Sequence, residues 1–205
     1  MTLTEKHITF ENDCRKMFVG ETIRAIIYGE LKHFPEEENK ISPEPNFRTK
    51  YIDIDSLDYS IYFKTDRKTI YIFWDNTFTC YGLLSKKLDL TETTNDYEQK
   101  WDVSTDTKWI EFIGQKIVDF KIDWYGINIK NKTYPQTFEI MTENRKSIYL
   151  TASELKEGED EYYSQMDNIL VTTNLNLLTK LQQIEQNQIK KIHSKKSLWR
   201  KILGK

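Results

Sequence analysis

The chain reads FVGETI at residues 18–23 and, in a related form, FIGQKI at residues 112–117. In both stretches a phenylalanine and a glycine lead into an isoleucine at the sixth position. Glycine adopts the left-handed backbone conformation in which many helices end, so each stretch predicts a turn from a helix into a strand. The fold should therefore use a helix–turn–strand design twice.

Further matches follow each of these turns. TDRKTIYI at residues 65–72 matches TENRKSIYL at residues 142–150, with one extra residue in the second copy. Two weaker pairs come next: CY at 80–81 with YY at 162–163, and LDL at 88–90 with ILV at 169–171. Because the order is the same in both halves, we expect an internal duplication, with repeats at residues 8–90 and 103–173.

Each repeat predicts one helix and four strands. Apolar residues recur at helical spacing over residues 10–18 and again over 105–113. In the strands that follow, apolar and polar residues alternate, which is typical of a strand with one buried face. We expect strands at 22–32, 60–65, 68–74 and 83–90 in the first repeat, and at 116–124, 137–141, 147–152 and 168–172 in the second.

The predicted fold class is α+β, mostly antiparallel β, with two diverged α-β-β-β-β repeats related by a pseudo-two-fold axis. A four-stranded unit leaves one sheet face bare, and two units can cover these faces on one another. We therefore expect a single β-rich domain over residues 1–173. Leucines at helical spacing after Asn174 predict a C-terminal amphipathic helix with Asn174 as its N-cap, and residues 174–205 hold this helix and a basic tail.

Charge is distributed unevenly along the chain. The net charge is −2, but the last 16 residues carry seven lysines and arginines and no acidic residue. The remainder then has 23 basic residues against 32 acidic ones, and such an acidic body disfavours a nucleic-acid backbone. The composition favours a protein partner and makes nucleic-acid binding by the folded part unexpected.

The sequence lacks recognisable motifs for catalysis or metal binding. The three histidines are widely separated, the seven glycines are scattered singly, and no serine lies in a glycine-flanked elbow. Cys14 and Cys80 have no metal-like spacing, so each is best interpreted as a small buried apolar residue. We therefore expect no metal and no cofactor, and favour binding over catalysis.

Residues 1–10 have no basic stretch followed by an apolar one, so we expect no signal peptide. No apolar run approaches 18 residues, so we expect no transmembrane helix. Abundant lysine, isoleucine, asparagine and tyrosine suit a bacterial protein. These features predict a cytoplasmic location.

A Trp-Asp dipeptide occurs twice, as Trp74-Asp75 and Trp101-Asp102. At the end of a strand, such a pair can line a ligand pocket or form a binding hot spot. The more ordinary interpretation is a tryptophan that closes the rim of the core. Both interpretations stay open from the sequence.

Two clusters of acidic residues and the basic tail are further candidates. Asp53, Asp55 and Asp58 form one cluster, and Glu157, Glu159, Asp160 and Glu161 the other. Both clusters are expected to be solvated loops, with an acidic recognition surface as the functional alternative. In the tail, contact with an anionic membrane or an acidic partner would use Lys195, Lys196, Trp199, Arg200 and Lys201, although a solvated helix end explains them equally.

The turn at residues 112–117, with the charged hairpin at 143–150, resembles a pattern in uncharacterised small bacterial proteins. Some of these resemble the immunity proteins that accompany polymorphic toxins. The resemblance covers about half of the chain and implies a β-rich protein that occludes a toxin domain. It transfers no functional residue to this sequence.

Three functions remain open. The first is a non-enzymatic immunity or antitoxin-type inhibitor that binds another protein, such as a basic toxin domain. The second is a small-ligand-binding domain or an unrecognised enzyme with a pocket between the repeats. The third is a membrane-peripheral protein that uses the basic tail.

Overall fold

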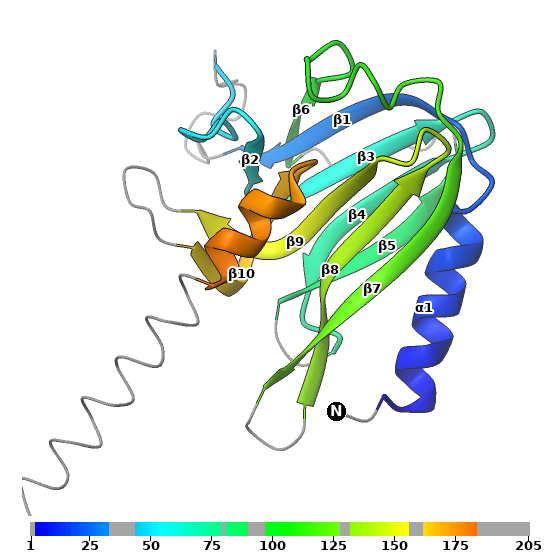
Figure 1. The fold of residues 1–205 in the computed structure, drawn as a ribbon, viewed down its shortest axis with the longest axis vertical. Coiled ribbons are helices and arrows are strands. Elements are labelled where there is room, and N and C mark those ends of the chain that lie inside the picture. The colour runs from blue at the N-terminus through cyan, green and yellow to red at the C-terminus, as the bar shows by residue number, and fades with distance from the viewer. Residues whose placement is uncertain are drawn as a thin grey trace, which may run out of the picture.

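The computed structural model describes residues 3–32, 44–78, 81–89, 97–127, 132–155 and 162–183. This part of the chain is α+β, with helix α1 (Glu5–Phe18), a second helix at 175–183 and two antiparallel sheets (Figure 1). The first sheet has the order β5-β4-β3-β1-β6 and contains β1 (Ile23–Leu31), β3 (Ser60–Thr65), β4 (Thr69–Asp75), β5 (Gly82–Leu88) and β6 (Glu98–Asp102). The second has the order β2-β10-β9-β8-β7 and contains β2 (Ile54–Leu57), β7 (Ile117–Ile127), β8 (Lys132–Thr142), β9 (Ser147–Leu155) and β10 (Tyr162–Thr172). The predicted α+β class with mostly antiparallel strands is confirmed.

The main core lies between the two sheets. It is built from alternate residues of the strands, such as Ile26 and Phe63 in the first sheet and Phe120 and Phe138 in the second. In the strand expected at 116–124, the alternation predicts that Val118 is buried together with Phe120. This detail is wrong: Val118 is 43% exposed, and the pairing of β7 with β8 is irregular directly after Ile117. Strands β3 and β4 differ from the expected single buried face, because Tyr62, Tyr71 and Phe73 form a second apolar cluster with Leu88 of β5.

The outer face of the second sheet is covered by the helix at 175–183 (Figure 1). Leu178 and Leu181 of this helix pack with Leu170 of β10 in a separate apolar cluster. The predicted cap is confirmed, since the backbone N–H of Leu177 donates to Asn174 Oδ1 at 3.1 Å. Such a cap typically contributes about 1 kcal/mol to helix stability.

The two turns that the sequence relates contact each other directly. Gly20 N donates to Ile117 O at 2.9 Å, and Gly114 N donates to Ile23 O at 2.8 Å. Both glycines have positive φ, at 90° and 83°, as the expected turns require. Thr22 and Lys116 form an antiparallel bridge between these two hydrogen bonds. Each hydrogen bond that one turn donates to the other is therefore matched by one in the opposite direction.

The strands after these turns pair in matching registers. Ile26 faces Phe63 across β1 and β3, while Phe120 faces Ile140 across β7 and β8. The third strand of each half continues the match, with Ile61 opposite Ile72 and Phe138 opposite Leu150. The fourth strands differ from the expected alignment: Leu83 lies opposite Trp74 and Ile169 opposite Ala152, so Leu83, and not the LDL stretch at 88–90, occupies the place of Ile169.

The hairpin turns explain the extra residue of the second half. Thr65 N donates to Lys68 O, and Thr142 N donates to Lys146 O, both at 2.9 Å. The longer turn places Arg145 at a φ of 64°, which is the left-handed residue that three-residue hairpin loops need. The additional residue of the second hairpin therefore lies in its loop, and the strand pairing on either side of that loop is regular.

The helix expected at residues 105–113 does not form, which is a correction. This segment is a series of turns in which Asp106 N donates to Val103 O, Trp109 N to Asp106 O and Phe112 N to Trp109 O. Thr105, Asp106 and Thr107 have low helix propensity. The turns nevertheless bury Trp109 and Phe112 completely, so the apolar spacing was correct and the element type was wrong.

Strands β2 and β6 were not expected. Residues 98–102 lie between the two predicted repeats, at 8–90 and 103–173, yet they pair with β1. The acidic stretch around Asp55 was expected to be a loop, yet β2 pairs with β10. No helix among the described residues is long and apolar enough to cross a membrane.

Candidate functional site

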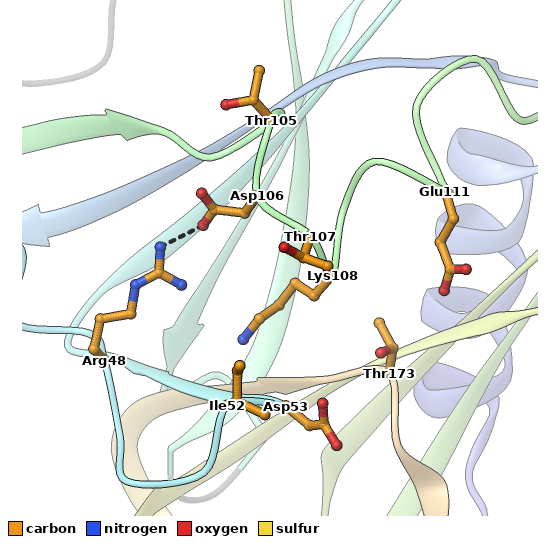
Figure 2. A pocket seen from close by; sticks show the side chains of 9 residues that line it. All are labelled: Arg48, Ile52, Asp53, Thr105, Asp106, Thr107, Lys108, Glu111 and Thr173. Carbon is orange, nitrogen blue, oxygen red and sulfur yellow. Dashed lines mark hydrogen bonds and ion pairs between the residues drawn. The ribbon is translucent and has the colours of Figure 1, made fainter.

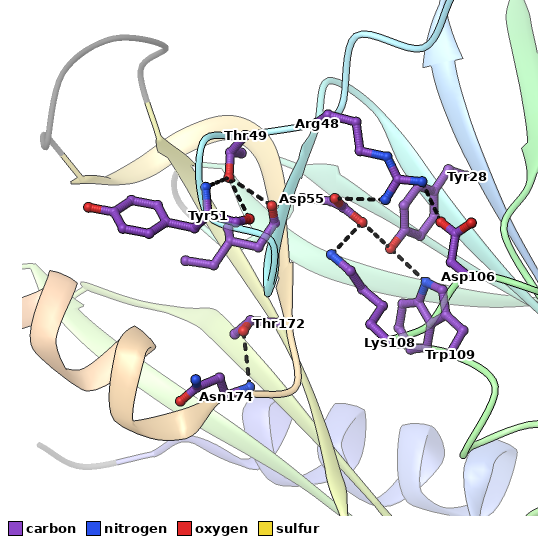
Figure 3. Close-up of polar contacts among 11 residues, drawn as sticks. Tyr28, Arg48, Thr49, Tyr51, Asp55, Asp106, Lys108, Trp109, Thr172 and Asn174 are labelled. Carbon is purple, nitrogen blue, oxygen red and sulfur yellow. Dashed lines mark hydrogen bonds and ion pairs between the residues drawn. The ribbon is translucent and has the colours of Figure 1, made fainter.

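A buried carboxylate, Asp55, lies where the two sheets meet at the β2 edge. Only 1% of Asp55 is exposed. Tyr28 of β1 donates its hydroxyl to Asp55 Oδ2 at 2.9 Å, and Trp109 Nε1 donates to the same Tyr28 hydroxyl at 2.8 Å (Figure 3). Asp55 therefore connects the second sheet, through β2, to the first sheet and to the turns at 104–114.

Two cations compensate the charge of this carboxylate. Lys108 Nζ lies 2.8 Å from Asp55 Oδ2, and Arg48 Nη1 lies 3.5 Å from Oδ1. Arg48 also forms an ion pair with Asp106 at 2.5 Å. We call the six residues that meet here the Asp55 cluster: Tyr28, Arg48, Asp55, Asp106, Lys108 and Trp109.

The environment shifts several pKa values in the cluster. Burial lowers the pKa of Lys108, because removal from water disfavours the ammonium, while Asp55 opposes this effect. Burial and the adjacent Asp55 carboxylate raise the pKa of Tyr28 well above its ordinary value. Burial alone would lower the pKa of Arg48, but the pairs with Asp106 and Asp55 outweigh it and raise that pKa.

Local turn chemistry positions β2 and Arg48. The Thr49 hydroxyl is 2.8 Å from the carbonyl of Ile54 and 3.2 Å from that of Tyr51, and it receives the Tyr51 N–H at 3.1 Å. Arg48 forms an antiparallel bridge with Asp55. Phe47 is buried edge-on against Tyr28 with ring centroids 4.8 Å apart. The segment before β2 thus folds back and brings Arg48 to the buried carboxylate.

A polar pocket of about 510 Å³ lies beside the Asp55 cluster (Figure 2). The segment before β2 and the turns at 104–114 form its main walls, and Thr173 after β10 lies at one side. All lining residues except Ile52 are polar or charged: Arg48, Ile52, Asp53, Thr105, Asp106, Thr107, Lys108, Glu111 and Thr173. Small-molecule pockets are usually lined mainly by apolar groups, so this lining is atypical for them.

Neighbouring groups fix the carboxylates on the Thr173 side of the pocket. Asn174 Nδ2 donates to Asp53 Oδ2 at 3.0 Å. Glu111 forms an ion pair with Lys146, whose side chain is 52% exposed. Asp53 is therefore held by a neutral amide, and Glu111 by a cation that is open to solvent.

The site provides charges and hydroxyls. The amine of Lys108 is buried against Asp55, and no histidine of the described segments lines the pocket beside the hydroxyls of Thr105, Thr107 and Thr173. In the part of the chain that the structure describes, no three histidine, cysteine or acidic side chains gather as metal ligands. The geometry suits recognition of a polar or charged group.

A second buried carboxylate, Glu98 of β6, has a different environment. It accepts hydrogen bonds from Tyr62, from Tyr71 at 3.1 Å and from Ser60 at 3.3 Å. Gly29 makes room for it, since a Cβ there would lie 2.7 Å from Glu98 Oε2 and 2.2 Å from Ser60 Oγ. These bonds attach the edge strand β6 across β1 to β3, and we interpret them as structural.

The first Trp-Asp pair lies at the end of β4. Trp74 Nε1 donates to the Asp58 carbonyl at 2.9 Å, and the ring packs edge-on against Tyr59 and Tyr81. Asp75 Oδ1 accepts the N–H and hydroxyl of Thr77 at 2.5 and 2.6 Å. Here the dipeptide closes a rim and caps a turn.

The second Trp-Asp pair lies at the end of β6. Trp101 packs partly buried against the core, and Asp102 Oδ1 accepts the N–H and hydroxyl of Ser104 at 3.0 and 2.6 Å. The bonds from Ser104 lower the pKa of Asp102. Because β4 and β6 are separated by β3 and β1 in the sheet, the two dipeptides do not share a site.

The other predicted site residues lie outside the described part of the chain. These are Glu157, Glu159, Asp160 and Glu161, and in the tail Lys195, Lys196, Trp199, Arg200 and Lys201. The structure instead draws attention to Asp55, which the sequence placed in a solvated loop. The alternation of Ile52, Ile54 and the acidic residues between them was the available signal for a short strand.

No family model, curated protein or solved structure matches this chain.

Proposed function

We propose that the protein is a non-enzymatic, protein-binding inhibitor of the immunity type, and that it binds its partner at the pocket beside the Asp55 cluster. The observation that carries the proposal is Ile52, a large apolar side chain that is 88% exposed at a pocket lined otherwise by polar groups. An apolar contact beside ordered charges is typical of a protein interface.

The rigid base of the pocket supports this function. Arg48, Asp106 and Lys108 are held in place by ion pairs with one another or with Asp55. Side chains that are already ordered lose little conformational entropy on binding, which favours affinity. The acidic composition of the body adds electrostatic attraction for a basic partner, such as a basic toxin domain, and mainly accelerates encounter.

The test compares two exposed isoleucines. Ile52→Asp places a charge at the pocket, and Ile8→Asp places the same charge on α1, where Ile8 is 51% exposed. Each variant is co-expressed with the product of the adjacent gene in a growth assay, and binding of the purified pair is measured by calorimetry. We expect Ile52→Asp to lose protection and binding, and Ile8→Asp to keep both.

Two results would contradict the proposal. One is that the product of the adjacent gene does not inhibit growth and does not bind the purified wild-type protein. The other is equal protection by both variants, which would exclude the pocket as the binding surface.

We further infer that the two halves derive from one α-β-β-β-β unit and are related by a pseudo-two-fold axis near Thr22 and Lys116. The reciprocal bonds of Gly20 and Gly114 and the matching strand registers support this. The turns at 104–114 are then the diverged counterpart of the last part of α1. Under this inference, the pocket arose where the second copy lost its helix.

A further inference from the structure

We infer that the pocket beside the Asp55 cluster receives a basic side chain, lysine or arginine, from the partner. This inference rests on the proposed function and adds the chemical class of the inserted group. Three observations support it: the pairing of the charged residues that line the cavity, the volume of the cavity, and the threonine hydroxyls in its lining.

The positive charges of the pocket wall are already paired with carboxylates. The Lys108 side chain is only 7% exposed, and its amine is buried 2.8 Å from Asp55. Arg48 is bound to Asp106 at 2.5 Å and to Asp55 at 3.5 Å. Figure 2 shows Arg48 and Asp106 together on one side of the pocket, across from Asp53 and Thr173. Although the Arg48 side chain is 49% exposed, an incoming anion would have to compete with the carboxylates that already pair with Arg48 and Lys108.

The negative charges are less fully compensated. Asp53 and Glu111 both line the Thr173 side of the pocket (Figure 2). The amide of Asn174 orients Asp53 without neutralising it, and the exposed Lys146 pairs with Glu111 from outside the lining. The lining holds three carboxylates, Asp53, Asp106 and Glu111, against the two cations Arg48 and Lys108, so the cavity has a net negative charge that attracts a positive group.

The remaining features select a long basic side chain over a bare cation. A cavity of about 510 Å³ has the size of a small-molecule site and admits a whole side chain. The hydroxyls of Thr105, Thr107 and Thr173 can accept hydrogen bonds from an ammonium or a guanidinium. Ile52 offers an apolar surface for the aliphatic stem, which lysine and arginine bury while their charged ends stay hydrated.

Capped amino acids test this inference without the partner. The probes are Nα-acetyl-arginine methylamide, Nα-acetyl-lysine methylamide and the uncharged isostere Nα-acetyl-citrulline methylamide, titrated into the full-length 15N-labelled protein. We expect the two basic probes to shift the backbone amide signals of Thr105, Thr107 and Thr173 in a saturable way. Citrulline should bind at least fivefold more weakly, and added salt should weaken only the basic probes.

Charge-neutral variants locate the effect. Asp53→Asn and Glu111→Gln keep the side-chain shape and should each weaken the arginine probe at least threefold. Asp13→Asn on α1 is the matched control, since it removes the same charge from a side chain that is 62% exposed and that pairs with Lys16 at 3.3 Å. This control should leave the arginine titration unchanged.

The inference is overturned if citrulline binds as well as arginine, if acetate shifts the same signals instead, or if no probe produces a saturable shift. These failures differ from a failure of the proposed function. If Ile52→Asp abolishes partner binding while no basic probe binds, the pocket is still the partner-binding surface, and only the inference of an inserted basic side chain is wrong. If arginine binds but Ile52→Asp still protects cells, the pocket chemistry stands and the function is wrong.

Discussion

The two open sides of the sheet pair are closed in different ways. On one side, α1 lies along β7 and reaches β5, with Arg15 bound to the Phe120 carbonyl at 2.9 Å and Cys14 Sγ 3.2 Å from Ser85 Oγ. On the other, the described residues include no helix that closes the gap: the segment before β2 and the turns at 104–114 meet around Asp55 (Figure 3). We call these the α1 side and the Asp55 side.

The two sides differ in the side chains that fill them, and this difference bears on which side stabilises the fold and which side is suited to binding. The α1 side is filled by apolar groups, including Phe18 stacked on Phe120 at 4.6 Å. Burial raises the pKa of the Cys14 thiol to about 12, so it stays a protonated, unreactive group. The Asp55 side buries ions and keeps a polar cavity, which a core built only for stability would fill with apolar side chains. This difference supports the proposal that the partner binds on the Asp55 side.

The largest effect is expected on the α1 side. Phe18 is fully buried, so Phe18→Ala should lower the free energy of unfolding by about 4 kcal/mol through lost burial and a cavity. Urea unfolding followed by tryptophan fluorescence measures this. A loss below about 1 kcal/mol would show that α1 is not part of the folding core.

A smaller loss is expected on the Asp55 side. Asp55→Asn leaves the buried Lys108 ammonium without a counter-charge and should cost about 3 kcal/mol in the same assay. Adding Lys108→Met removes the uncompensated charge and should recover part of the loss. The control is Asp66→Asn, in an exposed pair with Arg24, which should leave the urea midpoint unchanged. Equal effects of Asp55→Asn and Asp66→Asn would mean that the cluster is not buried.

The two turns at the junction of the halves should respond alike. Gly20 and Gly114 have positive φ, and a Cβ would contact nothing within 4 Å at either position. Alanine at each should therefore cost only backbone strain, on the order of 1–2 kcal/mol. Equal losses in the free energy of unfolding, measured with urea, would support the structural equivalence of the two turns. A difference of more than about twofold would argue against it.

The smallest predicted effect appears in alkaline solution. Because the pKa of Tyr28 is raised on folding, the folded state keeps a proton that the unfolded state releases above about pH 10. The stability contributed by Tyr28 is complete below that pH and decreases as the pH rises, by up to about 1.4 kcal/mol per pH unit.

The variant Tyr28→Phe should remove this part of the slope between pH 9.5 and 11. Tyr97→Phe, at a tyrosine that is 73% exposed, is the control and should keep the wild-type slope. Lys108 acts in the opposite sense, since its pKa is lowered on folding, and it remains in both variants. An unchanged slope in Tyr28→Phe would contradict the assigned role of Tyr28.

Local patterns explain how much of the fold was predictable. The hairpin of β3 and β4 and the turns at Gly20 and Gly114 follow from alternation and from glycine conformation, so the sequence places them well. The segment at 105–113 has an apolar spacing that suits a helix and a series of turns equally. Its outcome depends on how Trp109 fits against Tyr28, which lies 81 residues earlier in the chain.

The site was less predictable for the same reason. Asp55 is buried because Tyr28, Arg48 and Lys108 converge on it, and they come from three separate segments. From the local sequence alone, Asp55 is predicted to be an exposed acidic residue in a polar stretch. The Trp-Asp pairs were more visible in the sequence, yet Asp75 and Asp102 mainly bind the local Thr77 and Ser104.

Hydrogen exchange in the complex tests most directly whether the Asp55 side is the binding surface. Amide exchange of the full-length protein is compared with and without the purified product of the adjacent gene. We predict slower exchange at residues 44–53 and 104–111 on binding, and no change over α1. Protection of α1 with unchanged exchange on the Asp55 side would contradict the assignment.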